Sequence, residues 1–208
     1  KNNAILIFDE ISSGFRISSS GAHLVFDVIP DIAVFSKAIG NGYPISAIIG
    51  SMNVMKEAQE SFISSTSWSE KIGFTAAITT IKKHLKYDVS SHLKKIGKAV
   101  QESWINCSEK NNLKIKIKGI EPLSNFEFDE INQNHQLMKS LFIQEMLKKG
   151  ILATTGFYAM YSHTFENVKY YAESADEVFA KIRDWIDKGI LENKLEGSEA
   201  VKGFKRLN

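Results

Sequence analysis

The stretch of sequence that decides the fold is Ala4-Ile5-Leu6-Ile7-Phe8-Asp9-Glu10. Its first five residues are apolar without interruption, which is typical of a strand covered on both faces within a parallel sheet. Two carboxylates follow at once, and charged groups at the end of a buried strand need partners to offset their lost hydration. The stretch therefore predicts a central strand of an α/β sheet, with either chemistry or a capped turn at its carboxyl end.

Two further apolar runs, at residues 32–35 and 45–49, predict neighbouring strands. Between the first two runs lies a polar stretch from Ser12 to Gly21, whose five serines and two glycines are typical of a loop. Loops at the carboxyl ends of parallel strands are where α/β enzymes keep their reactive groups. Residues that act together are therefore expected at the ends of these strands.

Lys37 follows the second apolar run and precedes a glycine-rich turn at residues 40–44. A partly desolvated lysine amine is driven toward its neutral form, which is the nucleophile for a Schiff base. Asp9 ends another strand 28 residues upstream. Pyridoxal phosphate chemistry needs this pair, because a lysine holds the cofactor covalently and a carboxylate keeps its ring nitrogen protonated.

The motifs at residues 6–11, 14–16, 30–31 and 36–44 together resemble the class III (ornithine/GABA-type) aminotransferases, especially their glutamate-1-semialdehyde aminomutase-like branch. Residues 64–70, 150–153 and 161–164 extend the resemblance through nearly the whole chain. It implies an α/β fold of the fold-type I PLP-transferase kind. Residues 1–112 would form the C-terminal part of the cofactor-binding large domain, with a parallel or mixed sheet, and residues 113–208 a small α+β domain.

The resemblance also implies a role for each site residue. Lys37 would be the catalytic Schiff-base lysine and the base for proton transfer, and Asp9 would pair with the pyridinium nitrogen. Ile11 would lie against one ring face, and Ser12 near the phenolic oxygen. Thr66 would bind the phosphate of the neighbouring subunit's pyridoxal 5'-phosphate. A cytoplasmic homodimer with its cofactor site at the subunit interface, acting on small amino-group donors and acceptors, is expected.

The rest of the chain predicts helices over 71–111, a strand at 114–118 and a partner strand at 124–128. A helix carrying Met138 and Met146, a short strand at 151–153 and a last helix opened by a capping box at Ser174–Glu177 should follow. The first helical stripe holds Ile72, Ala76, Ile81 and Leu85, and the second holds Val89, Leu93, Ile96, Val100 and Trp104. The polar tail after Asp187 is expected to be loosely held.

Composition narrows the function classes. The 208 residues carry a formal net charge of +2, which gives no electrostatic case for nucleic acid. The single cysteine, Cys107, excludes an internal disulfide, and the histidines lack metal-ligand spacing. No apolar run reaches the roughly 20 residues of a membrane span. We expect Arg16 to anchor its loop rather than bind substrate.

Three functional hypotheses remain open. Class III enzymes are about twice this length, so the chain would lack the N-terminal half and would be part of an active aminotransferase or aminomutase. Alternatively it is a non-catalytic remnant that folds or dimerises. The third hypothesis is an ATPase built on Asp9-Glu10, against which stands the absence of a phosphate-binding glycine loop. No arginine lies between Gly150 and Glu173, which favours aminomutase-like chemistry or amine and amino-sugar substrates.

Overall fold

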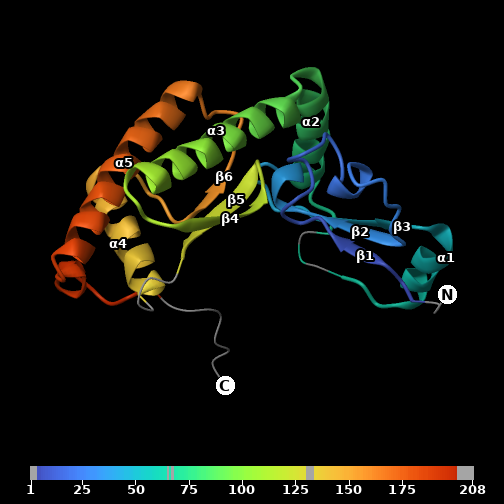
Figure 1. Ribbon diagram of the computed structural model, residues 1–208. Helices are drawn as coiled ribbons and strands as arrows, with labels where there is room; N and C mark the ends of the chain where they lie inside the picture. Colours follow the sequence, from blue (N-terminus) through green and yellow to red (C-terminus); the bar gives the residue numbers. More distant parts are fainter. Residues whose placement is uncertain (1–3, 65, 67, 130–133, 201–208) are drawn as a thin grey trace. The chain divides into compact units, whose positions relative to one another are not determined.

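The computed structural model describes residues 4–64, 66, 68–129 and 134–200. The chain divides into two compact units, residues 1–94 and 95–208, which Figure 1 shows in blue to green and in green to red. The helix α3 (Val89–Lys110) runs from the first unit into the second. The expected family boundary at residues 112 and 113 therefore falls just after this helix, and it stays a prediction.

The first unit is built on a mixed three-stranded sheet. Its strands are β1 (Ile7–Asp9), β2 (Ile32–Phe35) and β3 (Ala47–Gly50), in that spatial order. The parallel pair β1–β2 aligns Asp9 with Val34, and the antiparallel pair β2–β3 aligns Phe35 with Ala47. The predicted positions of the three strands and the mixed sheet are confirmed, although β1 begins three residues later than its apolar run.

Burial differs from the sequence expectation at β1. In the described part of the chain β1 pairs with β2 alone, and Ile5 and Ile7 are each 56% exposed. The prediction of a strand covered on both faces is therefore wrong for this chain by itself. Along β2 the burial alternates, since Ala33 and Phe35 are buried while Ile32 is only partly covered.

Short helices connect and follow the sheet of the first unit. They are the 3-10 helices η1 (Ala22–Leu24), η2 (Lys37–Ile39) and η3 (Lys56–Glu60), the helix α1 (Met52–Met55) and the longer α2 (Lys71–Lys86). A cluster of buried apolar side chains joins these elements to the sheet. It consists of Phe15, Ala33, Phe35, Ile39 and Ala77.

The helix α2 presents a different face to this core than its apolar stripe predicted. Gly73, Ala77 and His84 are buried, whereas Ile72 and Leu85 are more than half exposed. The reason is steric: a β-carbon on Gly73 would lie 2.9 Å from the carbonyl oxygen of Pro44, so only a small residue fits there. Close packing therefore overrides hydrophobicity in orienting this helix.

The second unit packs helices on an antiparallel sheet. The sheet contains β4 (Ile115–Ile120), β5 (Leu123–Phe128) and β6 (Gly156–Tyr158), and α4 (His135–Lys148), α5 (Phe165–Asp187) and the 3-10 helix η4 (Leu191–Lys194) complete the unit. The centre of this core is the fully buried ring of Phe126. Three other fully buried rings lie around it at centroid distances of 5.0–5.8 Å, those of Trp104, Phe142 and Phe179. The predicted apolar stripe of α3 is confirmed from Leu93 to Trp104, whereas its first member, Val89, is only partly buried.

Two boundaries in this unit were wrongly predicted. Residues 151–154 are irregular and the strand lies at Gly156–Tyr158, where Asn125 of β5 aligns with Gly156. The last helix begins at Phe165 instead of after Ser174, because the true capping box is formed by Thr164 and Asn167. Ser174 is a buried residue inside α5. A Ser-x-x-Glu pattern predicts a helix start only where no earlier cap has already begun the helix.

The tail after Asp187 is fastened to α4 through residue 200, contrary to the expectation of a loose end. Gln144 donates to the carbonyl of Lys194 at 3.0 Å and accepts from the amide of Glu196 at 2.8 Å. The amide of Ala200 donates to the Ser140 hydroxyl at 2.9 Å. These are backbone contacts, so they hold the path of the tail whatever its side chains.

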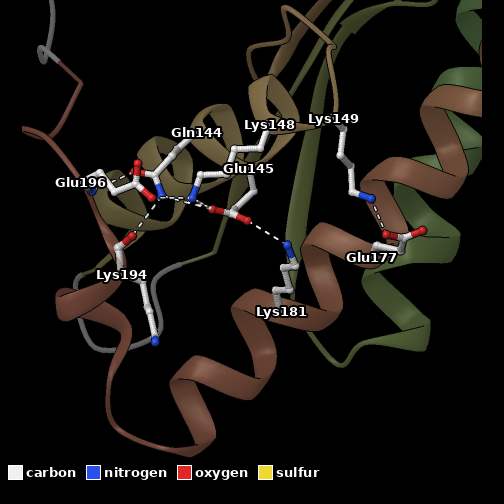
Figure 2. A network of polar contacts seen from close by, with 8 residues as sticks. All are labelled: Gln144, Glu145, Lys148, Lys149, Glu177, Lys181, Lys194 and Glu196. Atoms are coloured by element: carbon white, nitrogen blue, oxygen red, sulfur yellow. Dashed lines mark hydrogen bonds and ion pairs between the residues drawn. The ribbon is translucent and has the colours of Figure 1, made fainter.

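Beside this tail lies the buried carboxylate of Glu145, which Figure 2 shows between two lysines. It accepts from Lys148 at 2.7 Å and from Lys181 of α5 at 2.9 Å. Lys148 also bonds Glu196 of the tail at 2.6 Å. Burial alone would raise the pKa of Glu145, but the hydrogen bonds from Lys148, Lys181 and Gln144 outweigh it and lower that pKa to about 2.

We predict that Thr164→Ala lowers the free energy of unfolding by about 1 kcal/mol, because it removes the cap of α5. Urea unfolding followed by circular dichroism measures the change. The matched control is Ser174→Ala, which should cost clearly less. If Ser174→Ala were the more damaging substitution, the assignment of the helix start would be wrong.

A second prediction concerns pH. The pKa of Glu145 is lower in the folded than in the unfolded chain, so its contribution to stability is complete above pH 4.5 and is lost as the pH falls toward 2. The loss should reach about 3 kcal/mol, because one pKa unit corresponds to about 1.4 kcal/mol. Urea midpoints across this range should fall less steeply in Glu145→Gln. Parallel slopes for variant and parent would refute the assignment.

Candidate functional site

The carboxyl ends of the parallel strands β1 and β2 bring the expected site residues to one edge of the first sheet. Lys37 lies two residues after β2, and its Nζ donates a 2.5 Å hydrogen bond to the hydroxyl of Ser12, which lies three residues after β1. The two residues are 25 positions apart in the sequence. The structure thus joins the predicted lysine to one of the predicted cofactor-binding residues.

The backbone at Lys37 is unusual. Its φ is +48°, in the left-handed region that a residue with a β-carbon seldom adopts. Two residues of the following turn also have positive φ angles, +46° at Asn41 and +102° at Gly42. Such conformations tend to gather at functional sites, where the surrounding structure enforces them. Here the residue with this conformation carries an exposed side chain.

Asp9 ends β1 and its carboxylate is exposed. One oxygen accepts the backbone N–H of Ile11 at 3.0 Å, which holds the side chain at the start of the loop. Ile11 itself is partly buried. Asp9 and Lys37 therefore stand at the ends of adjacent parallel strands, as the sequence predicted. Among the described residues, no hydrogen bond is made to the second oxygen of Asp9.

Glu10 is the buried member of the acidic pair, with 1% of its surface exposed. Its carboxylate accepts the backbone N–H groups of Ala22 and His23, both at 2.7 Å, and the Ser13 hydroxyl at 2.9 Å. The His23 ring lies 2.8 Å from the same carboxylate. Burial raises the pKa of Glu10, but these hydrogen bonds outweigh it and the net direction is downward.

The loop between Glu10 and Ala22 is therefore closed at both ends by one carboxylate. Gly14 permits the closure, since a β-carbon there would lie 2.6 Å from the ring of Phe35. Arg16 donates from Nε to the carbonyl of Ser12 at 2.8 Å, which confirms its expected role as a loop anchor. From the sequence, Glu10 could only be read as a cap or a metal ligand.

Thr66 lies in a turn five residues before α2 begins, and its side chain is exposed. The structure brings it to none of the other expected site residues within the described ranges by any hydrogen bond. Ser65, which stands where the family usually has glycine, lies outside the described residues. A phosphate-binding role for Thr66 toward a second subunit therefore stays a prediction.

The residues present suit pyridoxal phosphate by the chemistry of their donor set. An exposed amine, a hydroxyl and a free carboxylate oxygen lie on one edge, and a pyridoxal ring needs partners of these kinds at its aldehyde, phenolic oxygen and ring nitrogen. Across residues 4–64, 66, 68–129 and 134–200, no group of three or more metal-ligating side chains occurs and no helix is long and apolar enough to span a membrane.

Comparison with known proteins identifies the class of this fold and site. Residues 1–186 match the family described as aminotransferase class-III, and the chain belongs to that family. The resemblance noted in the sequence is thereby confirmed. The chain spans about half the length of the curated relatives it matches.

Among these relatives are enzymes with different reactions. The chain is 31% identical over 194 residues to 3-aminobutyryl-CoA aminotransferase of Cloacimonas acidaminovorans, covering 88% of this chain and 45% of that protein. It is 26% identical over 197 residues to glutamate-1-semialdehyde 2,1-aminomutase of Methanocaldococcus jannaschii, with the same coverage of 88% and 45%. It is 26% identical over 168 residues to 2'-deamino-2'-hydroxyneamine transaminase of Streptomyces kanamyceticus, covering 80% and 42%.

The solved structures agree on the fold. The FumI protein of Sphingopyxis, in its PLP internal aldimine form, superposes with a TM-score of 0.81 at 22% identity, covering 90% of this chain and 46% of that one. An omega-transaminase of Sphaerobacter thermophilus gives a TM-score of 0.76 at 18% identity, covering 86% and 44%. The fold is therefore that of the fold-type I transaminases, as expected.

We predict that Glu10→Gln destabilises the first unit by about 2–3 kcal/mol, because an amide cannot replace the two charge-assisted acceptors. Hydrogen exchange of residues 13–23 should rise together with the loss of stability. Asp9→Asn is the matched control, since its carboxylate is exposed. Equal exchange in the two variants would show that Glu10 does not close the loop.

Proposed function

We propose that this chain supplies the lysine and carboxylate of a pyridoxal-phosphate site in an enzyme that transfers amino groups, by transamination or 2,1-aminomutation. The observation that carries the proposal is the geometry of one sheet edge. Lys37 and Asp9 follow adjacent parallel strands, and the Lys37 amine is held by Ser12. Family membership and the fold support the same assignment.

Each residue has a task in this proposal. When bound, the cofactor would supply an electron sink for the reaction. Lys37 would hold the cofactor and would move the proton at the reacting carbon of the substrate. Asp9 would keep the ring nitrogen protonated. Ser12 would orient the Lys37 amine, and Ile11 would lie against one face of the ring.

The assembly expected from the sequence is part of the same proposal. Thr66 would bind the cofactor phosphate of a second subunit, so that a homodimer completes each site. Residues 1–112 would belong to the cofactor-binding domain and residues 113–208 to the small domain. The protein would act in the cytoplasm on small amines. In this assignment the ATPase hypothesis fails, because the buried Glu10 is fully engaged by the loop.

A segment of the second unit indicates the substrate preference. Residues 150–173 contain no arginine, so a substrate α-carboxylate has no guanidinium partner in this segment. We therefore favour substrates in which another group is recognised, such as amines, amino sugars or an aminomutase substrate. The neamine-type transaminase and the aminomutases among the relatives have names consistent with these classes.

Lys37 should carry the cofactor. The chain is incubated with pyridoxal phosphate, alone and together with the N-terminal half of a full-length class III relative, then reduced with borohydride and mapped by mass spectrometry. We expect the pyridoxyl adduct on Lys37, weakly in the chain alone and strongly in the mixture. An adduct found only on other lysines would contradict the assignment. The Lys37→Ala variant shows how much adduct forms on the other lysines.

Asp9→Asn should still form the adduct but lose turnover by about a hundredfold, since removal of one electrostatic partner of the reacting group costs that much. Turnover is measured in the reconstituted mixture with an amine donor. Unchanged turnover would reduce Asp9 to a turn cap. Adduct formation without any turnover in the parent mixture would favour the hypothesis of a non-catalytic remnant.

A further inference from the structure

His84 is a buried histidine for which the sequence suggested no role. It lies in the last turn of α2 and is 4% exposed. Its ring makes two polar contacts, both to the loop that follows β1: Nε2 is 2.9 Å from the carbonyl oxygen of Phe15, and Nδ1 is 2.9 Å from the hydroxyl of Ser19. The ring also packs edge-on against the ring of Phe15.

These contacts fix the tautomer of the ring. A carbonyl oxygen only accepts, so the Nε2 facing Phe15 must carry the hydrogen. In a neutral ring Nδ1 is then the acceptor, and the Ser19 hydroxyl donates to it. Burial lowers the pKa of His84, ahead of the opposing effects of the Phe15 carbonyl and of Asp88, so the neutral form is favoured. A neutral His84 thus binds the loop through one donor, Nε2–H, and one acceptor, Nδ1.

The loop has a second fastening of a different kind. Glu10 binds its two ends, at Ser13 and at Ala22, whereas His84 binds its middle, at Phe15 and Ser19. Phe15 itself has φ +57°, a conformation that external contacts must maintain. Its amide donates across the loop to the carbonyl of Ser20 at 2.8 Å.

From this middle section a short path leads to the reactive amine. Arg16 follows Phe15 directly, and its Nε donates to the carbonyl of Ser12. Ser12 in turn accepts the hydrogen bond from the Nζ of Lys37. The position of the Ser12 hydroxyl therefore depends on a segment that His84 holds against α2. Every contact in this path lies within the first unit.

We propose that His84 is a positioning residue for the Lys37 amine, acting through the middle of the loop on the Ser12 hydroxyl. The role rests on the proposed function of Lys37, but the coupling itself exists in the chain without cofactor. Within the described residues His84 makes no hydrogen bond to Lys37 or Ser12. We therefore expect its effect to travel through Phe15, Arg16 and Ser19.

The coupling is measured by competitive labelling of the chain with trace acetic anhydride. The acetylation rate of Lys37 is read by mass spectrometry relative to Lys83, an exposed lysine of α2 that serves as an internal reference. Ser12→Ala should raise the Lys37 rate about fivefold, the equivalent of one ordinary hydrogen bond. His84→Ala and the milder Ser19→Ala should each raise the acetylation rate of Lys37 as well.

A double substitution separates positioning from general loosening. If His84 acts through Ser12, then His84→Ala combined with Ser12→Ala gives no higher rate than Ser12→Ala alone. His84→Gln, which keeps an N–H donor near Phe15, should restore part of the parental rate. Lys82→Ala, an exposed change on the same helix, should have no effect.

Hydrogen exchange of residues 13–22 provides the independent readout. It should rise in His84→Ala and Ser19→Ala while the amides of β2 stay protected. An unchanged Lys37 rate in both Ser19→Ala and His84→Ala, or additive effects in the double variant, would overturn the proposal. Failure of the proposed function looks different: the coupling would persist, but no pyridoxyl adduct would form on Lys37.

Discussion

The geometry of the candidate site depends on the burial of one carboxylate, that of Glu10. Moving a carboxylate from water into a protein interior costs several kcal/mol unless donors replace the lost hydration. Here Ser13, Ala22 and His23 supply those donors at 2.7–2.9 Å. The loop after β1 cannot open without stranding a buried charge. A segment rich in serine and glycine, which would otherwise be mobile, is thereby given one conformation.

Each of the two units buries a carboxylate, but the donors that replace its lost hydration are of different kinds. In the second unit Glu145 is also buried, but its partners are the lysine side chains Lys148 and Lys181, which reach it from two helices. Flexible lysines suit the joining of helices whose spacing is set by apolar packing. Backbone amides, which surround Glu10, suit the fixing of a loop path. The choice of partner thus follows from what each carboxylate has to hold.

The sequence predicted the elements with strong periodicity and missed those that depend on contacts across the chain. The strand at residues 32–35 and the stripe from Leu93 to Trp104 were predicted correctly, because their apolar spacing is local. The buried face of α2 was predicted wrongly, because it depends on the close approach of Gly73 to Pro44, a residue outside the helix. For the site, Lys37, Asp9 and Ser12 could be identified from motifs. The roles of Glu10 and His84 could not, since all of their partners except Ser13 lie 12 to 69 positions away.

The left-handed backbone at Lys37 has an evolutionary consequence. A β-carbon in this region costs about 1–2 kcal/mol, and glycine avoids the cost entirely. Replacement of Lys37 by glycine would therefore remove this cost and raise the stability of the first unit. The sequence nevertheless has lysine at this position. Folding alone would therefore favour glycine over lysine at this position.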